Sequence, residues 1–211
     1  MTNSNPMVYV VDDDPSIRRA LSRLIRSMDI DCETFGLAQE VLDRLSHSAP
    51  GCILLDVMMP GLSGLELQKE LARRGVRIPV VFISGQGDIP TSVSAMKAGA
   101  SDYLTKPIDE RDLIAVIEQA LAKDKSIRAE QSELDGIRER LAGLTPREYE
   151  VFQKVVVGRL NKQIAADLGT CEKTIKVHRA RVMSKMRVSS VAELARLAER
   201  VGVPKPTDDH R

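Results

Sequence analysis

The stretch from Cys52 to Gly64, CILLDVMMPGLSG, decides the fold of this 211-residue chain. Four apolar residues lead to a carboxylate, Asp56, and then to a loop rich in turn-forming residues. A short apolar run bounded by turn residues is typical of a strand buried on both faces of a parallel sheet. Because ligands bind beyond the carboxyl ends of such strands, Asp56 lies where chemistry is expected. The alternative is that Asp56 only begins a turn.

The first 121 residues repeat this arrangement, because an apolar run is followed by a helical pattern five times. The alternation predicts a doubly wound α/β domain with a parallel sheet. Since crossovers between parallel strands are right-handed, all five strands should end at one edge of the sheet. The expected strands are 7–11, 32–35, 52–56, 78–83 and 102–105.

Side chains suited to phosphate and metal chemistry follow these strands. Three carboxylates that lie close together repel one another and need a cation, and an all-oxygen ligand set suits Mg²⁺. A lysine pairs with a carboxylate or a phosphate, a serine hydroxyl donates to an anionic oxygen, and an aspartate can itself accept a phosphoryl group. Each residue alone has a structural explanation, but together they predict a magnesium-dependent phosphoryl site. These residues are Asp12, Asp13, Asp56, Ser84 and Lys106.

The segments VDDD, LLDVMMPGLSG, ISG and AGASDYLTKP, within residues 5–121, resemble the receiver domain of two-component response regulators. The resemblance implies a flavodoxin-like sheet of five parallel strands in the order 2-1-3-4-5. It also implies that a sensor histidine kinase phosphorylates Asp56. Asp13, Asp56 and the main-chain carbonyl of Met58 would hold Mg²⁺, with Asp12 acting through a water molecule.

The same resemblance assigns roles to other side chains. Ser84 and Lys106 would bind the phosphoryl oxygens, and Tyr103 would turn inward as a switch when Ser84 moves. The peptide bond between Lys106 and Pro107 is expected to be cis. After phosphorylation, a surface of the receiver would form a homodimer. That surface includes Val93, Met96 and Lys97.

Charge divides the chain into two halves. Residues 1–121 hold 12 basic and 17 acidic residues, for a net charge of −5, whereas the remaining residues hold 19 and 13, for +6. Halves of opposite charge predict two domains with different partners. Residues 122–141 are predicted to be a helical linker, because apolar residues continue at helical spacing. A dimeric coiled coil and a charged, solvated tether are the alternatives.

The second half contains two helical patterns joined by a tight turn at Gly169, which predicts a helix-turn-helix. The second of these helices enters the major groove in this class of protein. It has a basic polar face, on which Lys176 or Arg179 could read guanine and which also includes Lys185. The alternative is a solvated charged face. The candidates for DNA contact are Lys173, Thr174, Lys176, Val177, His178, Arg179 and Arg181.

Residues 142–203 resemble the LuxR-type (GerE-like) DNA-binding domain, and the whole chain is similar to the NarL/FixJ family, nearest its FixJ branch. The resemblance implies a transcriptional regulator, more an activator than a repressor. It would bind double-stranded DNA and have a sensor kinase and RNA polymerase as partners. Some relatives have a base-contacting lysine where this chain has Ala180, so the base readers stay open. Residues 204–211 are expected to be a flexible tail.

The composition excludes other classes. An apolar fraction of 43% predicts a folded protein. No run of 18 apolar residues and no signal-like start is present, so no membrane contact and a cytoplasmic location are expected. The cysteines Cys32, Cys52 and Cys171 lack zinc-site spacing and are expected to be buried hydrophobes.

No enzymatic activity is expected beyond self-catalysed phosphorylation and dephosphorylation of the receiver. One rival interpretation is a phosphohydrolase with Asp56 as nucleophile, which would need a second carboxylate where this chain has Met58. The other is a DNA-binding protein that is constitutively active because its receiver is silent. The acidic residues and the lysine at the strand ends argue against that second interpretation.

Overall fold

The computed structural model describes residues 6–47, 49–85 and 89–203. The chain divides into two compact units, Met1–Ala129 and Glu130–Arg211, and each unit has a hydrophobic core of its own. The first unit includes residues 122–129, which the sequence assigns to the linker. The predicted tail at 204–211 lies outside the described residues.

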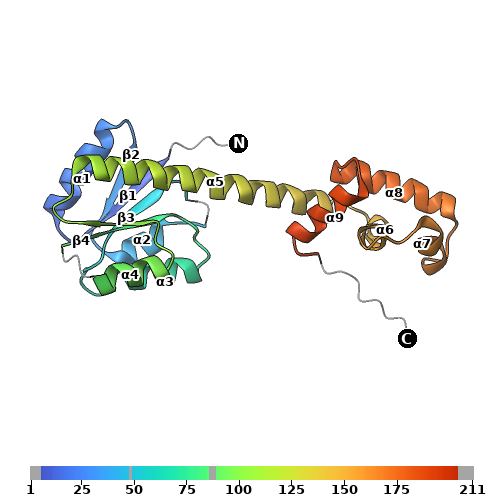
Figure 1. Cartoon of the computed structure of the whole chain (residues 1–211), viewed down its shortest axis with the longest axis horizontal. Coiled ribbons are helices and arrows are strands. Elements are labelled where there is room, and N and C mark those ends of the chain that lie inside the picture. The colour runs from blue at the N-terminus through green and yellow to red at the C-terminus, as the bar shows by residue number, and fades with distance from the viewer. Residues whose placement is uncertain (1–5, 48, 86–88, 204–211) are drawn as a thin grey trace. The chain divides into compact units, whose positions relative to one another are not determined.

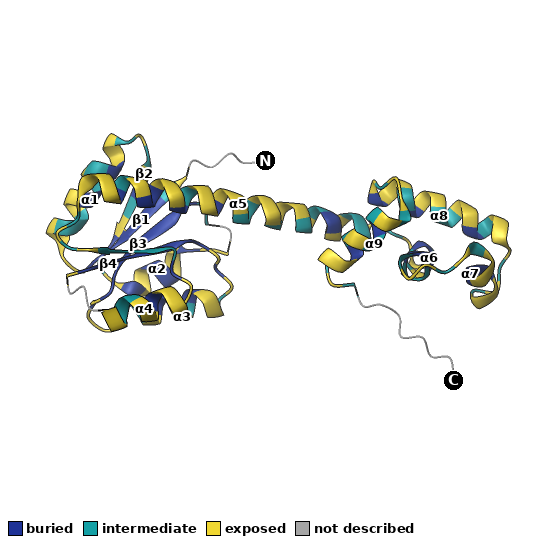
Figure 2. Cartoon of the chain, viewed as in Figure 1, coloured by how far each residue is buried: buried dark blue, intermediate teal, exposed yellow. Residues whose placement is uncertain are grey.

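A five-stranded parallel sheet forms the centre of the first unit. Its strand order is β2-β1-β3-β4-β5, as predicted. Every residue of β3 and β4 is buried, because helices cover both faces of these inner strands; Figure 2 shows the contrast with the exposed outer faces of the helices. The strands are β1 (Met7–Val11), β2 (Asp31–Phe35), β3 (Cys52–Asp56), β4 (Val80–Ser84) and β5 (Asp102–Thr105).

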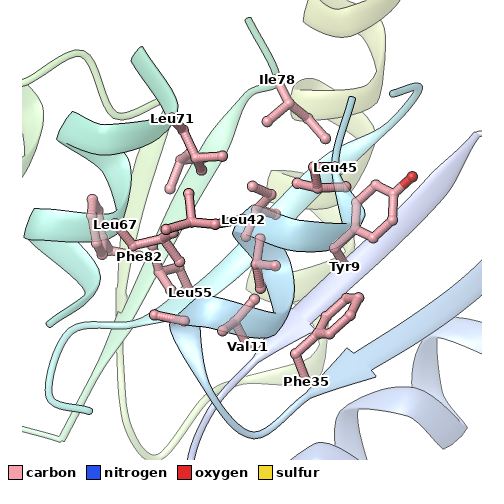
Figure 3. Close-up of a cluster of buried hydrophobic side chains, with 14 of the residues drawn as sticks. Tyr9, Val11, Phe35, Leu42, Leu45, Leu55, Leu67, Leu71, Ile78 and Phe82 are labelled. Carbon is pink, nitrogen blue, oxygen red and sulfur yellow. The ribbon is translucent and has the colours of Figure 1, made fainter. Parts of the chain in front are cut away.

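Alternate residues of the inner strands point to opposite sides of the sheet. Tyr9 and Leu55 belong to the core beneath α2, α3 and α4, part of which is shown in Figure 3. Val10 and Leu54 belong to the second core, on the side of α1 and α5. Figure 1 shows α1 and α5 on one face of the sheet and α3 and α4 on the other. The helices are α1 (Pro15–Ser27), α2 (Ala38–Arg44), α3 (Gly64–Arg73), α4 (Ile89–Lys97) and α5 (Glu110–Ala142).

Helix α5 contains residues 122–141, the predicted linker. Its Asp124 is buried within the first unit, where Oδ2 accepts a hydrogen bond of 3.0 Å from the main-chain N–H of Gly51. Gly51 has φ of +115°, and a Cβ atom there would lie 1.7 Å from the carbonyl oxygen of Met7. Glycine is therefore required at position 51, and Asp124 satisfies its buried amide.

The second unit is helical. Phe152 and Ile175 are fully buried in its core, together with Ile137 from the last turns of α5. Gly169, with φ of +60°, ends the first helix of the predicted helix-turn-helix. The helices are α6 (Pro146–Val156), α7 (Asn161–Asp167), α8 (Glu172–Met186) and α9 (Val191–Arg200).

The sequence also made predictions about the burial of the three cysteines and about membrane-spanning segments. Cys32 and Cys52 are buried as expected, but Cys171 is exposed. The prediction was wrong for Cys171 because this residue occupies the N-cap of α8, a position at the surface of the unit. Among the described residues, no helix is both long enough and apolar enough to cross a membrane.

Candidate functional site

Three polar side chains are buried at the carboxyl ends of neighbouring strands. Asp12 follows β1, Asp56 ends β3 and Ser84 ends β4, and their exposed fractions are 2%, 5% and 2%. Polar groups are rarely buried this deeply unless they are paired. Their burial at one edge of the sheet marks this edge as the candidate site.

Lys106, just after β5, joins two of these side chains. Its Nζ atom lies 2.8 Å from Asp12 Oδ2 and 2.6 Å from Asp56 Oδ1. The side chains of residues 12, 56 and 106 therefore converge, although they are far apart in the sequence. The side chain of Asp13 is exposed instead, and among the described residues no cluster of three carboxylate, histidine or cysteine side chains is arranged to hold a metal ion.

The charges at this site do not balance. Burial raises the pKa of Asp56, although the hydrogen bond from Lys106 acts in the opposite direction. Burial lowers the pKa of Lys106, but its hydrogen bonds to Asp12 and Asp56 outweigh that effect, so the pKa is raised overall. Two carboxylates thus share one ammonium group, which leaves excess negative charge at the site. Such a site favours a cation among its oxygen atoms.

Main-chain groups fix the two carboxylates. The N–H of Met58 donates to Asp56 Oδ2 at 2.7 Å, and the N–H of Asp14 donates to Asp12 Oδ1 at 2.8 Å. Gly64 was not identified from the sequence as part of the site, yet a Cβ atom there would lie 2.2 Å from the carbonyl oxygen of Asp56. The second glycine of PGLSG was the signal, because close backbone approach needs glycine.

The remaining predicted residues lie around this site and on α4. The Lys106–Pro107 peptide bond is cis, as predicted. Tyr103 is half-buried on β5, where it packs at the margin of the core. The predicted dimer surface on α4 is exposed: Val93 has an exposed fraction of 44% and Met96 of 47%, and Lys97 is also exposed.

Helix α8 is the candidate nucleic-acid interface. It starts at an N-cap in extended conformation and runs for 15 residues, and its buried residues face the core of the second unit. The seven candidates for DNA contact lie on the remaining surface. Lys173, Lys176, Val177 and Arg181 are exposed, whereas Thr174, His178 and Arg179 are half-buried.

Some of these candidates have partners within the unit. Arg179 Nη1 donates to Asn161 Oδ1 of α7 at 3.0 Å, which links the two helices of the motif. Lys176 Nζ lies 3.5 Å from a carboxylate oxygen of Glu172, one turn earlier. His178 Nδ1 is buried and has no hydrogen-bond partner among the described residues. Lys173 and Arg181 are exposed and, among the described residues, form no such ion pair.

The sequence predicted that Lys185 belongs to the basic face of α8, but its side chain contacts other parts of the second unit. Its Nζ atom lies 2.6 Å from Glu148 Oε2 and 3.1 Å from the carbonyl oxygen of Gly143. Lys185, together with the cap at Thr145, lowers the pKa of Glu148 to about 2. The side chain is thus engaged between α8 and the start of α6, a contact that helical periodicity alone could not identify.

Comparisons with known proteins agree with both halves of this description. The family model of the response regulator receiver domain matches residues 8–118. The model described as bacterial regulatory proteins, luxR family, matches residues 142–198. Together these segments cover most of the chain.

Curated relatives match the chain along its length. Nodulation protein W of Bradyrhizobium diazoefficiens and response regulator protein TodT of Pseudomonas putida are each 42% identical over 201 residues, which is 95% of this chain and 88% of theirs. Transcriptional regulatory protein FixJ of Azorhizobium caulinodans is 41% identical over 202 residues, with coverage of 96% and 95%.

Solved structures give the same result. The response regulator StyR has a TM-score of 0.82 and 44% identity, covering 93% of this chain and all of that one. Full-length FixJ from B. japonicum has a TM-score of 0.56 and 38% identity, covering 96% of this chain and all of that one. The chain therefore belongs to the FixJ-type response regulators of the NarL/FixJ family, which join a receiver domain to a LuxR-type DNA-binding domain.

Proposed function

We propose that phosphorylation of Asp56 switches the DNA binding of this two-component regulator. The observation that carries the proposal is the contact of 2.6 Å between Lys106 Nζ and a buried Asp56 oxygen, in a chain that also carries the basic helix α8. A buried carboxylate next to a lysine is a suitable phosphoryl acceptor. A basic recognition helix is suited to the major groove.

The phosphoryl donor in this proposal is a sensor histidine kinase. The phosphorus–nitrogen bond of its phosphohistidine breaks, and a bond forms between phosphorus and an Asp56 carboxylate oxygen. Lys106 and Ser84 would bind the phosphoryl oxygens, since an ammonium and a hydroxyl group both donate to anionic oxygens. The N–H of Met58 already orients the acceptor carboxylate.

Receiver domains as a family bind Mg²⁺ at the phosphorylation site. In this chain Asp12, Asp13, Asp56 and the carbonyl of Met58 would hold it. The excess negative charge of the two buried carboxylates over Lys106 fits such an ion. Mg²⁺, when bound, would offset the negative charge of the transferring group.

Phosphorylation would then draw in Ser84 and reorient Tyr103, which changes the surface of α4. Dimerisation through that surface would bring two α8 helices to two half-sites of one DNA duplex. RNA polymerase is the expected partner of the bound dimer, which would act as an activator in the cytoplasm. The protein would have no enzymatic activity other than the self-catalysed phosphorylation and dephosphorylation of its receiver.

The test compares DNA affinity with and without an acyl-phosphate donor, by fluorescence anisotropy of a labelled operator. The donor should tighten binding by the unmodified protein and by a control, Asp112→Asn, at an exposed acid of α5. It should have no effect on Asp56→Asn, which should also fail to incorporate phosphate. If the donor does not change the affinity of the unmodified protein, the receiver is silent. Repeated turnover of a phosphomonoester would instead support the phosphohydrolase.

A further inference from the structure

Helix α1 carries a row of arginines. The helix contains four of them and no acidic residue. Arg19, Arg23 and Arg26 are spaced four and three residues apart, so they share one side of the helix, and Arg18 lies beside them. With a rise of about 1.5 Å per residue, the row is about 12 Å long from Arg18 to Arg26.

These arginines line a groove between α1 and β2. The groove has a volume of about 380 Å³, and the hydroxyl-bearing residues Ser22 and Thr34 also line it. A volume of this order is typical of sites for small ligands, which span about 300–1,000 Å³. Guanidinium groups and hydroxyl groups are all hydrogen-bond donors, so the groove is suited to an anion.

The position of Arg18 is fixed by uncharged groups. Its Nη1 atom donates to the carbonyl oxygens of Asp12 and Asp13, at 2.5 and 2.9 Å. Its guanidinium also packs against Gly36, where a Cβ atom would lie 3.4 Å from Nη1. Arg18 thus joins the groove to the loop of the phosphorylation site, while its charge stays uncompensated.

Two of the other arginines also donate to uncharged groups. Arg26 Nη2 donates to the carbonyl oxygen of Cys32 at 3.3 Å, and Arg19 Nη2 donates to Ser16 Oγ at 3.2 Å. Among the described residues, none of the four forms an ion pair with a carboxylate. The guanidinium groups of Arg18, Arg19 and Arg26 are therefore held by uncharged partners but not neutralised, which favours binding of an anion from outside.

We propose that this groove binds a compact polyphosphate, a small ligand that carries several phosphoryl groups. Guanidinium groups form paired hydrogen bonds with phosphate, and a polyphosphate brings several negative charges into one small volume. An acidic protein surface is a poorer match, since several carboxylates would have to converge in the groove against their mutual repulsion.

The surroundings of the groove disfavour a long polyanion such as duplex DNA. Residues 1–121 have a net charge of −5, from 12 basic and 17 acidic residues. Exposed carboxylates flank α1 at both ends, with Asp14 at its start and Asp29 and Asp31 after its end. A duplex laid along the arginines would also pass over these carboxylates, whereas a compact ligand contacts only the groove.

Isothermal titration of the full chain with inorganic tripolyphosphate, without Mg²⁺, tests the proposal. Because α8 is also basic, the double variant Arg19→Gln/Arg23→Gln is compared with Lys173→Gln/Arg181→Gln, which removes the same charge from α8. The groove variant should bind tripolyphosphate about tenfold more weakly than the unmodified chain, and the α8 variant should keep the unmodified affinity. Equal affinity of the groove variant and the unmodified chain would overturn the proposal.

Two further measurements make the result specific. The variant Arg19→Lys/Arg23→Lys keeps the charge but loses the paired hydrogen bonds. Its affinity for tripolyphosphate should therefore lie between that of the unmodified chain and that of Arg19→Gln/Arg23→Gln. Titration with a duplex that lacks an operator should be unaffected by Arg19→Gln/Arg23→Gln. If duplex binding falls as much as tripolyphosphate binding, the groove is a nucleic-acid surface and the proposal is wrong.

Discussion

Lys106 balances part of the charge of two buried carboxylates, and its removal should be costly. We expect Lys106→Met to lower the free energy of unfolding of the receiver by about 3 kcal/mol, because Asp12 and Asp56 would be left buried without their shared ammonium group. The receiver transition in urea, followed by circular dichroism, measures this loss.

Lys97→Met is the matched control for that prediction. Lys97 is exposed on α4, so its replacement should change the free energy of unfolding by less than about 0.5 kcal/mol. Addition of Mg²⁺ should stabilise Lys106→Met more than it stabilises the unmodified protein, since the carboxylates then lack their other cation. An equal response to Mg²⁺ in both proteins would contradict this explanation.

The positions of Asp12, Asp56 and Lys106 were predictable because parallel strands bring their carboxyl ends to one edge. The role of Arg18 was not predictable, because the approach of its side chain to the loop after β1 leaves no periodic trace in the sequence. Gly64 had a local signal, the second glycine of PGLSG, but the backbone atom that it approaches could not be named from the sequence. The exposure of Asp13 is likewise a property of the loop and not of the strand before it.

At the scale of helices, Lys185 of α8 and Glu148 of α6 form a contact that should stabilise the second unit. We expect Lys185→Met to lower its free energy of unfolding by about 1 kcal/mol at pH 7. The pKa of Glu148 is lowered from 4.5 to about 2, so the contact stabilises the unit above pH 4.5, and this contribution is lost as the pH falls toward 2. The difference between the two proteins should therefore shrink over that range in urea unfolding.

Lys173→Met is the comparison on the same helix. Lys173 is exposed on α8, so this variant should leave stability unchanged and weaken DNA binding. It should also reduce the slope of log affinity against log salt concentration by about 1, as expected for one lost phosphate contact. Lys185→Met should keep the slope of the unmodified protein. A reduced slope would show that Lys185 contacts DNA.

The starts of several helices depend on local sequence alone. Asp14, Ser63 and Thr145 each accept a hydrogen bond from the main chain at the start of a helix, where short polar side chains before a helical pattern indicate a cap. The length of α5 was harder to predict. Gly136 and Gly143 weaken the helical pattern, and charged residues interrupt the heptads, so the sequence left a tether and a coiled coil as alternatives.

For the whole molecule, the exposed apolar residues of α4 should control assembly. We expect phosphorylation to double the mass of the unmodified protein in size-exclusion chromatography with light scattering. Val93→Asp/Met96→Asp should stay monomeric while Asp56 still accepts phosphate, because charges cannot be buried in an apolar interface. Val157→Asp, at an apolar residue of similar exposure in the second unit, should dimerise normally. If the α4 variant still dimerises, the interface does not include this surface of α4 and the prediction is wrong.

The division into an acidic and a basic half was visible in the sequence, because the net charge changes from −5 over residues 1–121 to +6 over the remaining residues. The alternation of strands and helices likewise predicted the parallel sheet, and the tight turn at Gly169 predicted the helix-turn-helix. The groove along α1 was not predictable. It depends on which arginines form ion pairs in the folded chain, and the sequence of α1 does not show whether its four arginines form them.

The hydrogen bond between Asp124 and Gly51 has a practical consequence for anyone who divides this protein. A fragment that stops at residue 121, the end of the receiver predicted from the sequence, would leave an amide of its interior without an acceptor. Expression of the isolated receiver, or its fusion to a foreign output module, should therefore place the junction after Ala129.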